Sequence, residues 1–447
     1  MKKHTQSPYE SSKVSYKPSG IKWLGEIPQG WEIKKLKYIG EIFGGVTGKT
    51  IKDFSKEYKP NFKPYITFTN VCNNAVINPD LMEYVFIDSK EKQNKVLKND
   101  ILFLQSSETF EDVGKSAIYL NDDEVYLNTF CKGFRIKREA YSMYLNYLLS
   151  SLNYKRYFMS VCSGFTRINL RQEHFLDIPL ILPPLQEQKE IAEFLDKKCE
   201  KIQNYIDKKQ KLITLLQEKK QALINEVVTK GLNPNIEFKN SGIAYLGLIP
   251  HHWEVKKLKH ICKINPQTNE TLPNNFVYID LESVAKGQLL KEQTINKEQA
   301  PSRAQRILQK QDILFQLVRP YQRNNYIFNK NGDYVASTGY AQIRTKECVN
   351  FVYYALLENS FVERVILKST GSNYPAITSN DFADLKIPLP PLQEQEEIVE
   401  FLDSKVAQID SVIEKTKKQI KLIKEYKNTL INEAVCGRIN LQKKERI

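Results

Sequence analysis

The sequence LPPLQEQ occupies residues 182–188, and the same seven residues return at 389–395. Two further segments match each other upstream of these: SGIKWLGEIPQGWEIKKLKYI begins at Ser19, and SGIAYLGLIPHHWEVKKLKHI begins at Ser241. A chance recurrence of both segments in the same order is very improbable. The chain is therefore an internal repeat, in which two similar frames enclose segments of different sequence.

Each LPPLQEQ segment introduces a predicted long helix. Its two prolines are tolerated immediately before a helix but not inside one, and no further Pro or Gly occurs before Gly231 in the first copy or Gly437 in the second. Apolar residues then recur at intervals of three, four and seven, which is the spacing of a coiled-coil seam. These residues are Ile191, Leu195, Cys199, Ile202, Ile206, Ile213, Leu216, Leu223 and Val227 in the first helix, and Ile398, Leu402, Val406, Ile409, Ile413, Ile420, Ile423, Leu430 and Ala434 in the second.

A helix of about 42 residues would be about 63 Å long, and alone it would expose its apolar seam. It therefore needs a partner. The first helix ends where the second enclosed segment begins, and the second helix starts where that segment ends. Because the two ends of a domain commonly lie close together, the two helices are expected to run antiparallel.

The enclosed segments have the pattern of mixed α/β domains. Residues 100–103 and 312–315 both read Asp-Ile-Leu-Phe, which predicts a buried strand. A hairpin is expected after each strand. In the second copy Asn331-Gly332 suits a tight turn, and the acidic run at 121–124 takes its place in the first.

Aromatic-rich segments at 141–159 and 351–368 are predicted to be helical, with Gly164 and Gly371 following them. The predicted fold class is therefore α/β (mixed): two similar α/β domains joined by two long antiparallel coiled-coil helices, with a pseudo-twofold internal repeat. The predicted divisions are a polar N-terminal tail at 1–18, a first domain at 19–182, a first long helix at 183–231, a second domain at 232–389, a second long helix at 390–437 and a C-terminal tail at 438–447.

Composition favours a basic protein that meets a polyanion. Lys and Arg number 66 against 52 Asp and Glu, a formal net charge of +14. Such an excess attracts nucleic acid. No apolar run is long enough for a membrane span and the N-terminus lacks the apolar core of a secretory signal, so we expect a cytoplasmic protein. The seven cysteines form no C-x-x-C pair, which favours reduced thiols over a disulfide framework or a zinc cluster.

With these features together, the chain resembles the specificity subunits of type I restriction-modification systems over nearly its whole length. The resemblance is carried by the repeated SGI.WLG.IP..WE.KKLK segment, by IPLILPPLQEQ and IPLPPLQEQ with the helices that follow them, and by DILFQLVRPYQRN and STGYAQIR in the second copy. In the first copy, residues 104–109 read LQSSET and lack the Val-Arg-Pro of the second.

The resemblance implies that each variable domain is a target-recognition domain that reads one half of an interrupted sequence in double-stranded DNA. It implies that the paired helices set the gap between the halves and dock two adenine-methylating modification subunits, which restriction subunits join. The chain itself would be non-catalytic and would hold no cofactor or metal. S-adenosylmethionine, ATP and Mg would belong to the partner subunits.

Two stretches resemble catalytic motifs without matching them. GGVTGKT at 44–50 lacks the first glycine of a phosphate-binding P-loop, because Phe43 occupies that position. A turn that contacts a DNA phosphate is the better interpretation. Asp80, Asp88 and Lys90 resemble the metal-binding carboxylates and lysine of a nuclease, so a stand-alone nuclease remains an alternative. A non-specific DNA-binding coiled-coil scaffold is the other.

Candidate DNA contacts are polar and basic side chains in two kinds of loop, because base edges are read by hydrogen-bonding groups while cations neutralise phosphates. They are Thr47, Lys49, Thr50, Thr166, Arg167 and Asn169 in the first domain, and Arg319, Tyr321, Arg323, Asn324, Ser372, Asn373 and Tyr374 in the second.

Candidate partner contacts are polar residues that both copies keep at the helix ends, away from the apolar seam. A chain without catalytic groups has a use for a docked enzyme, so we expect these residues to bind the modification subunits. They are Gln186, Glu187, Gln188, Asn225 and Glu226 in the first copy, and Gln393, Glu394, Gln395, Asn432 and Glu433 in the second.

Overall fold

The computed structural model describes residues 15–164, 167–268 and 270–439. The chain divides into two compact units. Unit 1 comprises residues 1–208 and 419–447, and unit 2 comprises residues 209–418, so each unit contains part of both long helices. Each unit is described by itself.

The two long helices are α5, Leu185–Lys230, and α10, Leu392–Val435, with 46 and 44 residues. Every predicted seam residue in both helices is buried or half-buried, so the seam prediction is confirmed. Neither Gly nor Pro interrupts either helix, and the polar faces are rich in Lys and Glu, which are good helix formers. In the described part of the chain, no helix combines the length and apolar character that crossing a membrane requires.

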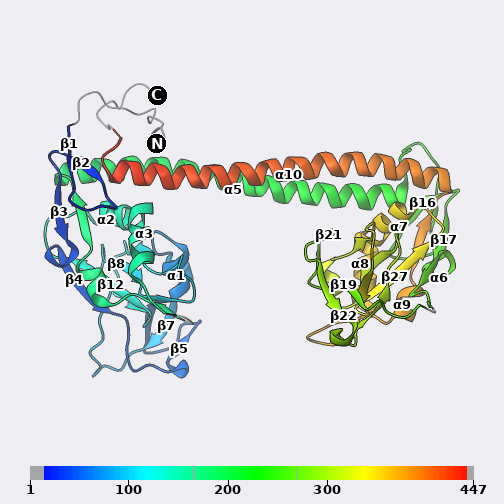
Figure 1. Ribbon diagram of the computed structural model, residues 1–447, viewed down its shortest axis with the longest axis horizontal. Helices are drawn as coiled ribbons and strands as arrows, with labels where there is room; N and C mark the ends of the chain where they lie inside the picture. The colour runs from blue at the N-terminus through cyan, green and yellow to red at the C-terminus, as the bar shows by residue number, and fades with distance from the viewer. Residues whose placement is uncertain (1–14, 165–166, 269, 440–447) are drawn as a thin grey trace. The chain divides into compact units, whose positions relative to one another are not determined.

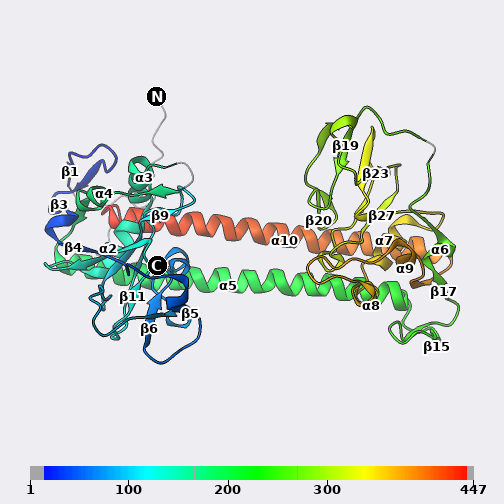
Figure 2. The same ribbon diagram turned by 90° about the horizontal axis from the view of Figure 1, so that it is seen from below.

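Within each unit the helices run antiparallel, as predicted. In unit 1 the Tyr144 hydroxyl lies 2.9 Å from the carbonyl oxygen of Ile181, just before α5, and 3.3 Å from that of Val435, at the end of α10. In unit 2 the Lys220 Nζ lies 2.7 Å from an oxygen of Asp410. The start of one helix therefore lies beside the end of the other (Figures 1 and 2).

Unit 1 contains two four-stranded sheets. One has the order β10-β8-β12-β4 and is antiparallel, and the other has the order β11-β6-β7-β5, with β11 and β6 parallel. Figure 1 shows α2 and α3 between these strands and the helix segments of the unit. The strands are β1 Tyr16–Pro18, β2 Glu26–Pro28, β3 Glu32–Lys35, β4 Gly40–Gly44, β5 Phe54–Ser55, β6 Phe62–Ile66, β7 Glu83–Phe86, β8 Ile101–Leu104, β9 Ser106–Ser107, β10 Ser116–Ile118, β11 Tyr126–Leu127, β12 Cys131–Ile136, β13 Ile168–Asn169 and β14 Pro179–Leu182. The shorter helices are η1 Leu36–Tyr38, η2 Ile51–Asp53, α1 Phe68–Asn73, η3 Pro79–Leu81, α2 Ser142–Ser150, α3 Leu152–Val161 and α4 Gln172–Leu176.

Unit 2 repeats this construction with sheets in the orders β18-β27-β24-β25 and β22-β19-β26-β23. Its strands are β15 Phe238–Asn240, β16 Leu248–Pro250, β17 Glu254–Lys257, β18 Cys262–Ile264, β19 Asn275–Ile279, β20 Val284–Ala285, β21 Gln288–Leu289, β22 Gln293–Asn296, β23 Ala304–Ile307, β24 Ile313–Gln316, β25 Tyr326–Ile327, β26 Tyr334–Ser337, β27 Tyr340–Thr345 and β28 Lys386–Leu389. Its shorter helices are α6 Leu258–Ile261, η4 Lys297–Gln299, η5 Pro320–Gln322, α7 Val349–Leu356, α8 Asn359–Lys368 and α9 Ser379–Ala383. A core cluster joins α7, α8 and β24 to the end of α5 and the start of α10.

Two local predictions are wrong in the same way in both copies. The turns at 331–332 and 121–124 do not close hairpins, because the strands before and after each turn belong to different sheets. The turns carry the chain from one sheet to the other. Each predicted aromatic helix is also two helices, with a break at Ser151 in unit 1 and at 357–358 in unit 2.

In both copies a buried aspartate immediately before the shared strand pairs with a partly exposed arginine. Asp312, just before β24, is fully buried and accepts hydrogen bonds from Arg344 Nε at 2.8 Å and Nη2 at 2.9 Å. Asp100 accepts from Arg135 Nε at 3.0 Å at the same place in unit 1. Each aspartate also accepts a backbone N–H three residues before it. The repeated Asp-Ile-Leu-Phe motif thus preserves a charge pair as well as a strand.

Candidate nucleic-acid interface

In unit 2 the structure brings together the two loops from which DNA contacts were predicted. Arg319 N–H donates to the Pro375 carbonyl oxygen at 2.7 Å, and Val318 forms a bridge with Ala376. The Arg319 guanidinium lies 4.3 Å from the centre of the Tyr374 ring, a cation–π contact. Tyr374 is 63% exposed, so one surface presents a cation, a phenol and an aromatic face.

The Arg319 loop is held in a conformation that costs free energy. Arg319 and Arg323 have φ angles of 55° and 53°, in the left-handed region, on either side of η5. The buried Gln316 fixes this loop through its side chain, which accepts from Asn324 N–H at 3.1 Å and donates to Gln322 Oε1 at 2.8 Å. Asn325 Oδ1 in turn accepts from the backbone N–H of Gln316 at 2.8 Å. The loop is therefore preorganised by amide hydrogen bonds beneath it.

The other predicted residues of unit 2 fall into two groups. Tyr321, Ser372 and Asn373 are exposed on the same loops as Arg319 and Tyr374. Arg323 points inward instead: its guanidinium donates to Asn359 Oδ1 at 2.7 Å, and burial lowers the pKa of this group. Asn324 contributes its backbone N–H to the network under the loop. In this structure the half-buried Arg323 anchors the loop, because its guanidinium is engaged by Asn359 of the same unit.

Unit 1 also has an arginine–aromatic pair, and one of its members lies on a corresponding loop: Arg167 follows α3 as Tyr374 follows α8, whereas Phe130 lies between β11 and β12. The guanidinium of Arg167 lies 4.3 Å from the centre of the Phe130 ring. Asn169 Nδ2 donates to the Arg167 carbonyl oxygen at 3.1 Å, and β13 pairs with β9 beside it. Phe130 was not predicted, because a single exposed phenylalanine between two strands carries no signal in the sequence. Thr166, also predicted, lies outside the described residues.

The polar groups of the glycine-rich turn of unit 1 are already bound within the unit. The Lys49 ammonium pairs with Glu91 and its side chain is only 4% exposed. Thr47 is tied through its backbone to the side-chain amide of Gln93. Thr50 caps η2 together with Asp53, and the Thr50 hydrogen bonds lower the pKa of that carboxyl. Lys49 is therefore a neutralised cation in this structure, and a phosphate would have to displace Glu91 to reach it.

Cations that the sequence analysis did not single out follow this turn. Four lysines between residues 52 and 63 are exposed, and none of them forms an ion pair with a described residue: Lys52, Lys56, Lys59 and Lys63. Exposed, unpaired lysines on one segment are suited to neutralise phosphates. Their signal in the sequence was the density of lysine in IKDFSKEYKPNFKP.

The alternative nuclease residues do not form a site that could hold a metal. Asp80 is exposed in η3, and Asp88 accepts the backbone N–H of Lys90 at 2.8 Å, a local turn contact. Over the described ranges there is no group of three or more His, Cys, Asp and Glu side chains placed to bind a metal ion.

In unit 1 the repeated Gln-Glu-Gln of LPPLQEQ binds the unit itself. Trp31 Nε1 donates to Glu187 Oε2 at 3.1 Å. The buried Gln188 accepts the Tyr141 N–H at 2.9 Å and donates to the Pro183 carbonyl oxygen at 2.8 Å. These contacts join three parts of the unit. They are the turn between β2 and β3, the residue that precedes α2, and the start of α5.

Unit 2 makes the same junction. Trp253 Nε1 donates to Glu394 Oε2 at 3.0 Å. Gln395, which is fully buried, accepts the Cys348 N–H at 3.1 Å and donates to the Pro390 carbonyl oxygen at 2.9 Å. The two copies keep the same residues because each builds the same joint between a domain and a helix.

The predicted asparagines at the other helix ends also bind within their own units. Asn432 Oδ1 accepts the Asn153 N–H at 3.3 Å at the start of α3, and Asn225 Oδ1 accepts the Asn359 N–H at 3.1 Å at the start of α8. Each long helix thus caps a helix of the domain that the other long helix leaves.

These contacts reduce the surface on which partner binding was predicted. Gln188 and Gln395 are buried and cannot be reached by another protein in this structure. Gln186, Gln393 and Glu226 remain exposed. Glu433 is half-exposed and pairs with Arg438 at 3.1 Å.

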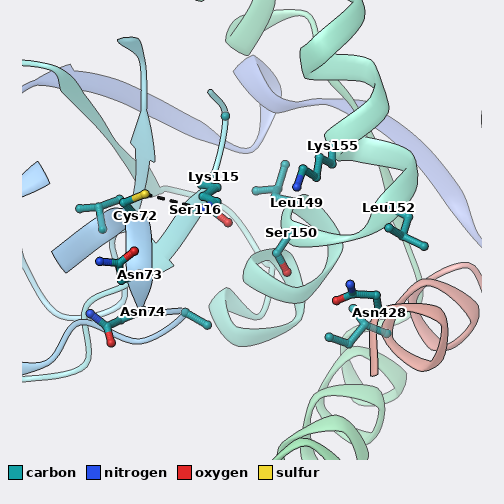
Figure 3. A pocket seen from close by; sticks show the side chains of 14 residues that line it. Cys72, Asn73, Asn74, Lys115, Ser116, Leu149, Ser150, Leu152, Lys155 and Asn428 are labelled. Atoms are coloured by element: carbon teal, nitrogen blue, oxygen red, sulfur yellow. Dashed lines mark hydrogen bonds between the residues drawn. The ribbon is translucent and has the colours of Figure 1, made fainter. Parts of the chain in front are cut away.

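A pocket in unit 1 lies where the domain meets α10 (Figure 3). Asn73 and Asn74 line it from the end of α1, Lys155 from α3, and Asn428 from α10. Cys72, also in its wall, lies 3.6 Å from the Lys115 ammonium, but burial raises the pKa of the thiol. A neutral thiol is a poor nucleophile, so Cys72 gives this pocket no catalytic group. The pocket is the junction between the domain and α10.

Comparison with known proteins identifies the family. The sequence profile described as "Type I restriction modification DNA specificity domain" matches residues 28–216 and 250–422. A putative type I restriction enzyme MjaX specificity subunit from Methanocaldococcus jannaschii is 30% identical over 437 residues, covering 94% of this chain and 96% of that protein. The type I restriction enzyme MjaVIII specificity subunit of the same organism is 25% identical over 441 residues, covering 93% and 94%.

The fold is also shared with a solved structure from work on complex assembly and conformational transition of the type I R-M system. The TM-score is 0.68 at 16% identity, covering 92% of this chain and 98% of the other. The profile matches once in each copy of the repeat. The chain therefore belongs to the type I restriction-modification specificity family, as a DNA-recognition subunit that is not itself an enzyme.

Proposed function

We propose that each unit reads one half of an interrupted DNA target, and that the two halves have different sequences. The observation that carries this proposal is the arginine–aromatic pair in each unit. Arg167 and Tyr374 lie on corresponding loops, after α3 and α8, but Arg167 contacts Phe130 between β11 and β12 whereas Tyr374 contacts Arg319 after β24. One framework therefore presents different chemistry on corresponding loops, which suits two readers of unlike base sequences.

The DNA-contacting surface of unit 2 consists of Arg319, Tyr321, Ser372, Asn373 and Tyr374. Arginine can bind a guanine edge with two hydrogen bonds, and hydroxyl and amide groups can pair with either donors or acceptors on base edges. In unit 1 the surface consists of Arg167, Asn169 and the exposed lysines of residues 52–63. The excess of basic residues supplies affinity for phosphates, which falls steeply with salt.

The paired helices set the gap between the two half-sites and dock two modification subunits. An uninterrupted helix of 46 residues is about 69 Å long, and its length is fixed by its hydrogen bonds. Exposed polar residues near the helix ends, including Gln186, Gln393 and Glu226, are the docking candidates. The modification subunits would use S-adenosylmethionine to methylate an adenine flipped out of each half-site. The restriction subunits would use ATP and Mg, and the assembly would act on DNA in the cytoplasm.

Methylation sequencing tests this function. Cells that carry the chain with its modification subunits should contain methylated adenine in one two-part motif, with a constant gap. Duplex containing that motif should bind the purified complex more tightly than random duplex. A methylated motif without two parts, or equal binding of both duplexes, would contradict the proposal. The chain alone with Mg should leave DNA intact, whereas cleavage would favour the nuclease alternative.

A further inference from the structure

A hollow in unit 1 lies beside the glycine-rich turn from which DNA contacts were predicted. It is bordered by Lys49 and Thr50 of the glycine-rich turn on one side. On the other side is Phe130, whose ring Arg167 contacts. Figure 2 shows the labelled strands β5, β6 and β11, from which much of the wall is built, in one region of the unit. The other residues that line it are Ile51, Phe54, Tyr65, Thr67, Phe68, Thr69, Glu83, Asn128 and Thr129.

Most polar groups of this hollow are occupied in holding its shape. Asn128 Nδ2 donates to the Tyr65 hydroxyl at 2.6 Å, and Asn128 Oδ1 accepts the Phe130 N–H at 2.9 Å. The Thr67 hydroxyl caps α1 by accepting a backbone N–H, and it lies 3.1 Å from the hydroxyl of Thr69. These contacts fix the wall and leave few groups for a ligand.

Glu83 is different. It is half-buried at the start of β7, opposite Tyr65 in the neighbouring strand. Its carboxylate makes no hydrogen bond or ion pair with any described residue, although a carboxylate has two oxygens that can accept. Solvent reaches its oxygens, so a donor from outside the protein can replace water there.

The charge around the hollow indicates which class of molecule would supply that hydrogen-bond donor. Exposed lysines at 52, 56, 59 and 63 follow the wall segment along the chain, and they favour a polyanion. A carboxylate repels phosphate, so within a phosphate-binding surface it suits a base edge. The donors that bases present in the major groove are the exocyclic amino groups of cytosine and adenine.

We propose that the carboxylate of Glu83 accepts a hydrogen bond from the exocyclic amino group of a cytosine or adenine in the half-site that unit 1 reads. Thymine and guanine present oxygen acceptors in the corresponding place, so Glu83 rejects them at this position. This inference rests on the proposed function and assigns one base-reading group within it. Neither the sequence motifs nor the predicted contact residues included Glu83.

The test uses the purified complex of the full chain with its modification subunits, which selects bound duplexes from a random pool. Glu83→Gln keeps the shape of the side chain and removes its charge, and Glu83→Ala removes the group. Glu41→Gln is the matched control, because Glu41 lies in the same unit, is exposed and pairs with Lys137 at 2.8 Å. The wild type should require cytosine or adenine at one position of one half-site.

Both Glu83 variants should lose about tenfold in discrimination at that position. The second half-site and the gap should stay as in the wild type, which also shows that the variants fold. The Glu41 variant should select the wild-type motif. Wild-type selectivity in both Glu83 variants would overturn the inference while leaving the proposed function intact, and so would an equal loss of affinity for every sequence. A wild-type complex that selects no two-part motif would overturn the proposed function, and this inference with it.

Discussion

Trp253 Nε1 donates a hydrogen bond of 3.0 Å to Glu394 Oε2, which joins the turn between β16 and β17 to the first turn of α10. Trp31 and Glu187 make the same contact in unit 1. Both tryptophans are buried. An indole N–H that is buried needs an acceptor, so the two repeated segments, the one that carries the tryptophan and LPPLQEQ, are two halves of one joint.

The contact between Trp31 and Glu187 predicts that the stability of unit 1 depends on pH. Burial raises the pKa of the Glu187 carboxyl above its ordinary value of 4.5, although the Trp31 N–H opposes the shift. A carboxyl whose folded pKa is raised binds its proton more strongly in the folded state. Its contribution to stability is therefore greatest at acidic pH and is lost as the pH rises from 4.5 through the raised folded value.

Glu187→Gln should keep an oxygen acceptor for Trp31 and remove this titration. The stability of unit 1, measured by hydrogen exchange between about pH 4.5 and pH 7, should then change less with pH than in the wild type. Glu193→Gln, on an exposed position of the same helix, is the control and should retain the wild-type slope. An unchanged slope in Glu187→Gln would show that this carboxyl does not titrate differently on folding.

The ion pair between Asp312 and Arg344 in unit 2 predicts a loss of stability. Asp312→Ala leaves the Arg344 guanidinium without its partner and removes the acceptor for the Gln309 N–H. The Arg344 side chain is 34% exposed and water can reach it, so the cost is that of lost hydrogen bonds to a charged group, about 1.5–3 kcal/mol. Hydrogen exchange in β24 and β27 should report that loss, while Asp333→Ala, at an exposed position, should change the free energy of unfolding by less than about 0.5 kcal/mol.

The Arg319–Tyr374 pair predicts a defect confined to one half-site. Arg319→Ala should weaken binding of the selected duplex by about tenfold and relax one base position, because a bidentate arginine contact contributes discrimination of that size. Arg364→Ala is the matched control: Arg364 is exposed in the same unit and also lies over a ring, at 5.5 Å from the centre of Tyr245. Equal effects of the two substitutions would remove Arg319 from the base-reading surface.

If the paired helices set the gap in the DNA target, lengthening both helices should change the gap and leave the two half-sites unchanged. Four residues inserted near Lys209 in α5, with four inserted near Thr416 in α10, lengthen each helix by about 6 Å and nearly preserve its facing. The methylated motif should keep both half-sites and gain one or two base pairs between them. Altered half-sites with the original gap would contradict the role of the helices as a ruler.

Several features could be predicted from the sequence because they depend on local periodicity or on direct repetition. The seam from Ile191 to Val227 follows from intervals of three, four and seven, since only one helix face can bury them. The strand at 312–315 follows from a short apolar run. The duplication of the whole fold follows from the two identical LPPLQEQ segments.

Other features depended on which segments meet in space. Nothing in LPPLQEQ indicates that Gln188 and Gln395 turn inward, because their acceptors and donors lie elsewhere in the chain. The same holds for Lys49, which a glutamate more than forty residues away neutralises. The type of a polar residue determines what its side chain can bind. Only the tertiary structure shows whether another part of the protein already binds that side chain.

The sequence by itself thus determined the repeat, the two long helices and the family, because these are properties of order and spacing along the chain. The tertiary structure decided which polar groups remain available to DNA. It uses Gln188, Gln395 and Arg323 for internal contacts, and it leaves Arg319, Tyr374 and Glu83 at the surface or in a hollow. Hydrogen-bonding capacity is local, but its satisfaction depends on neighbours that folding brings from distant parts of the chain.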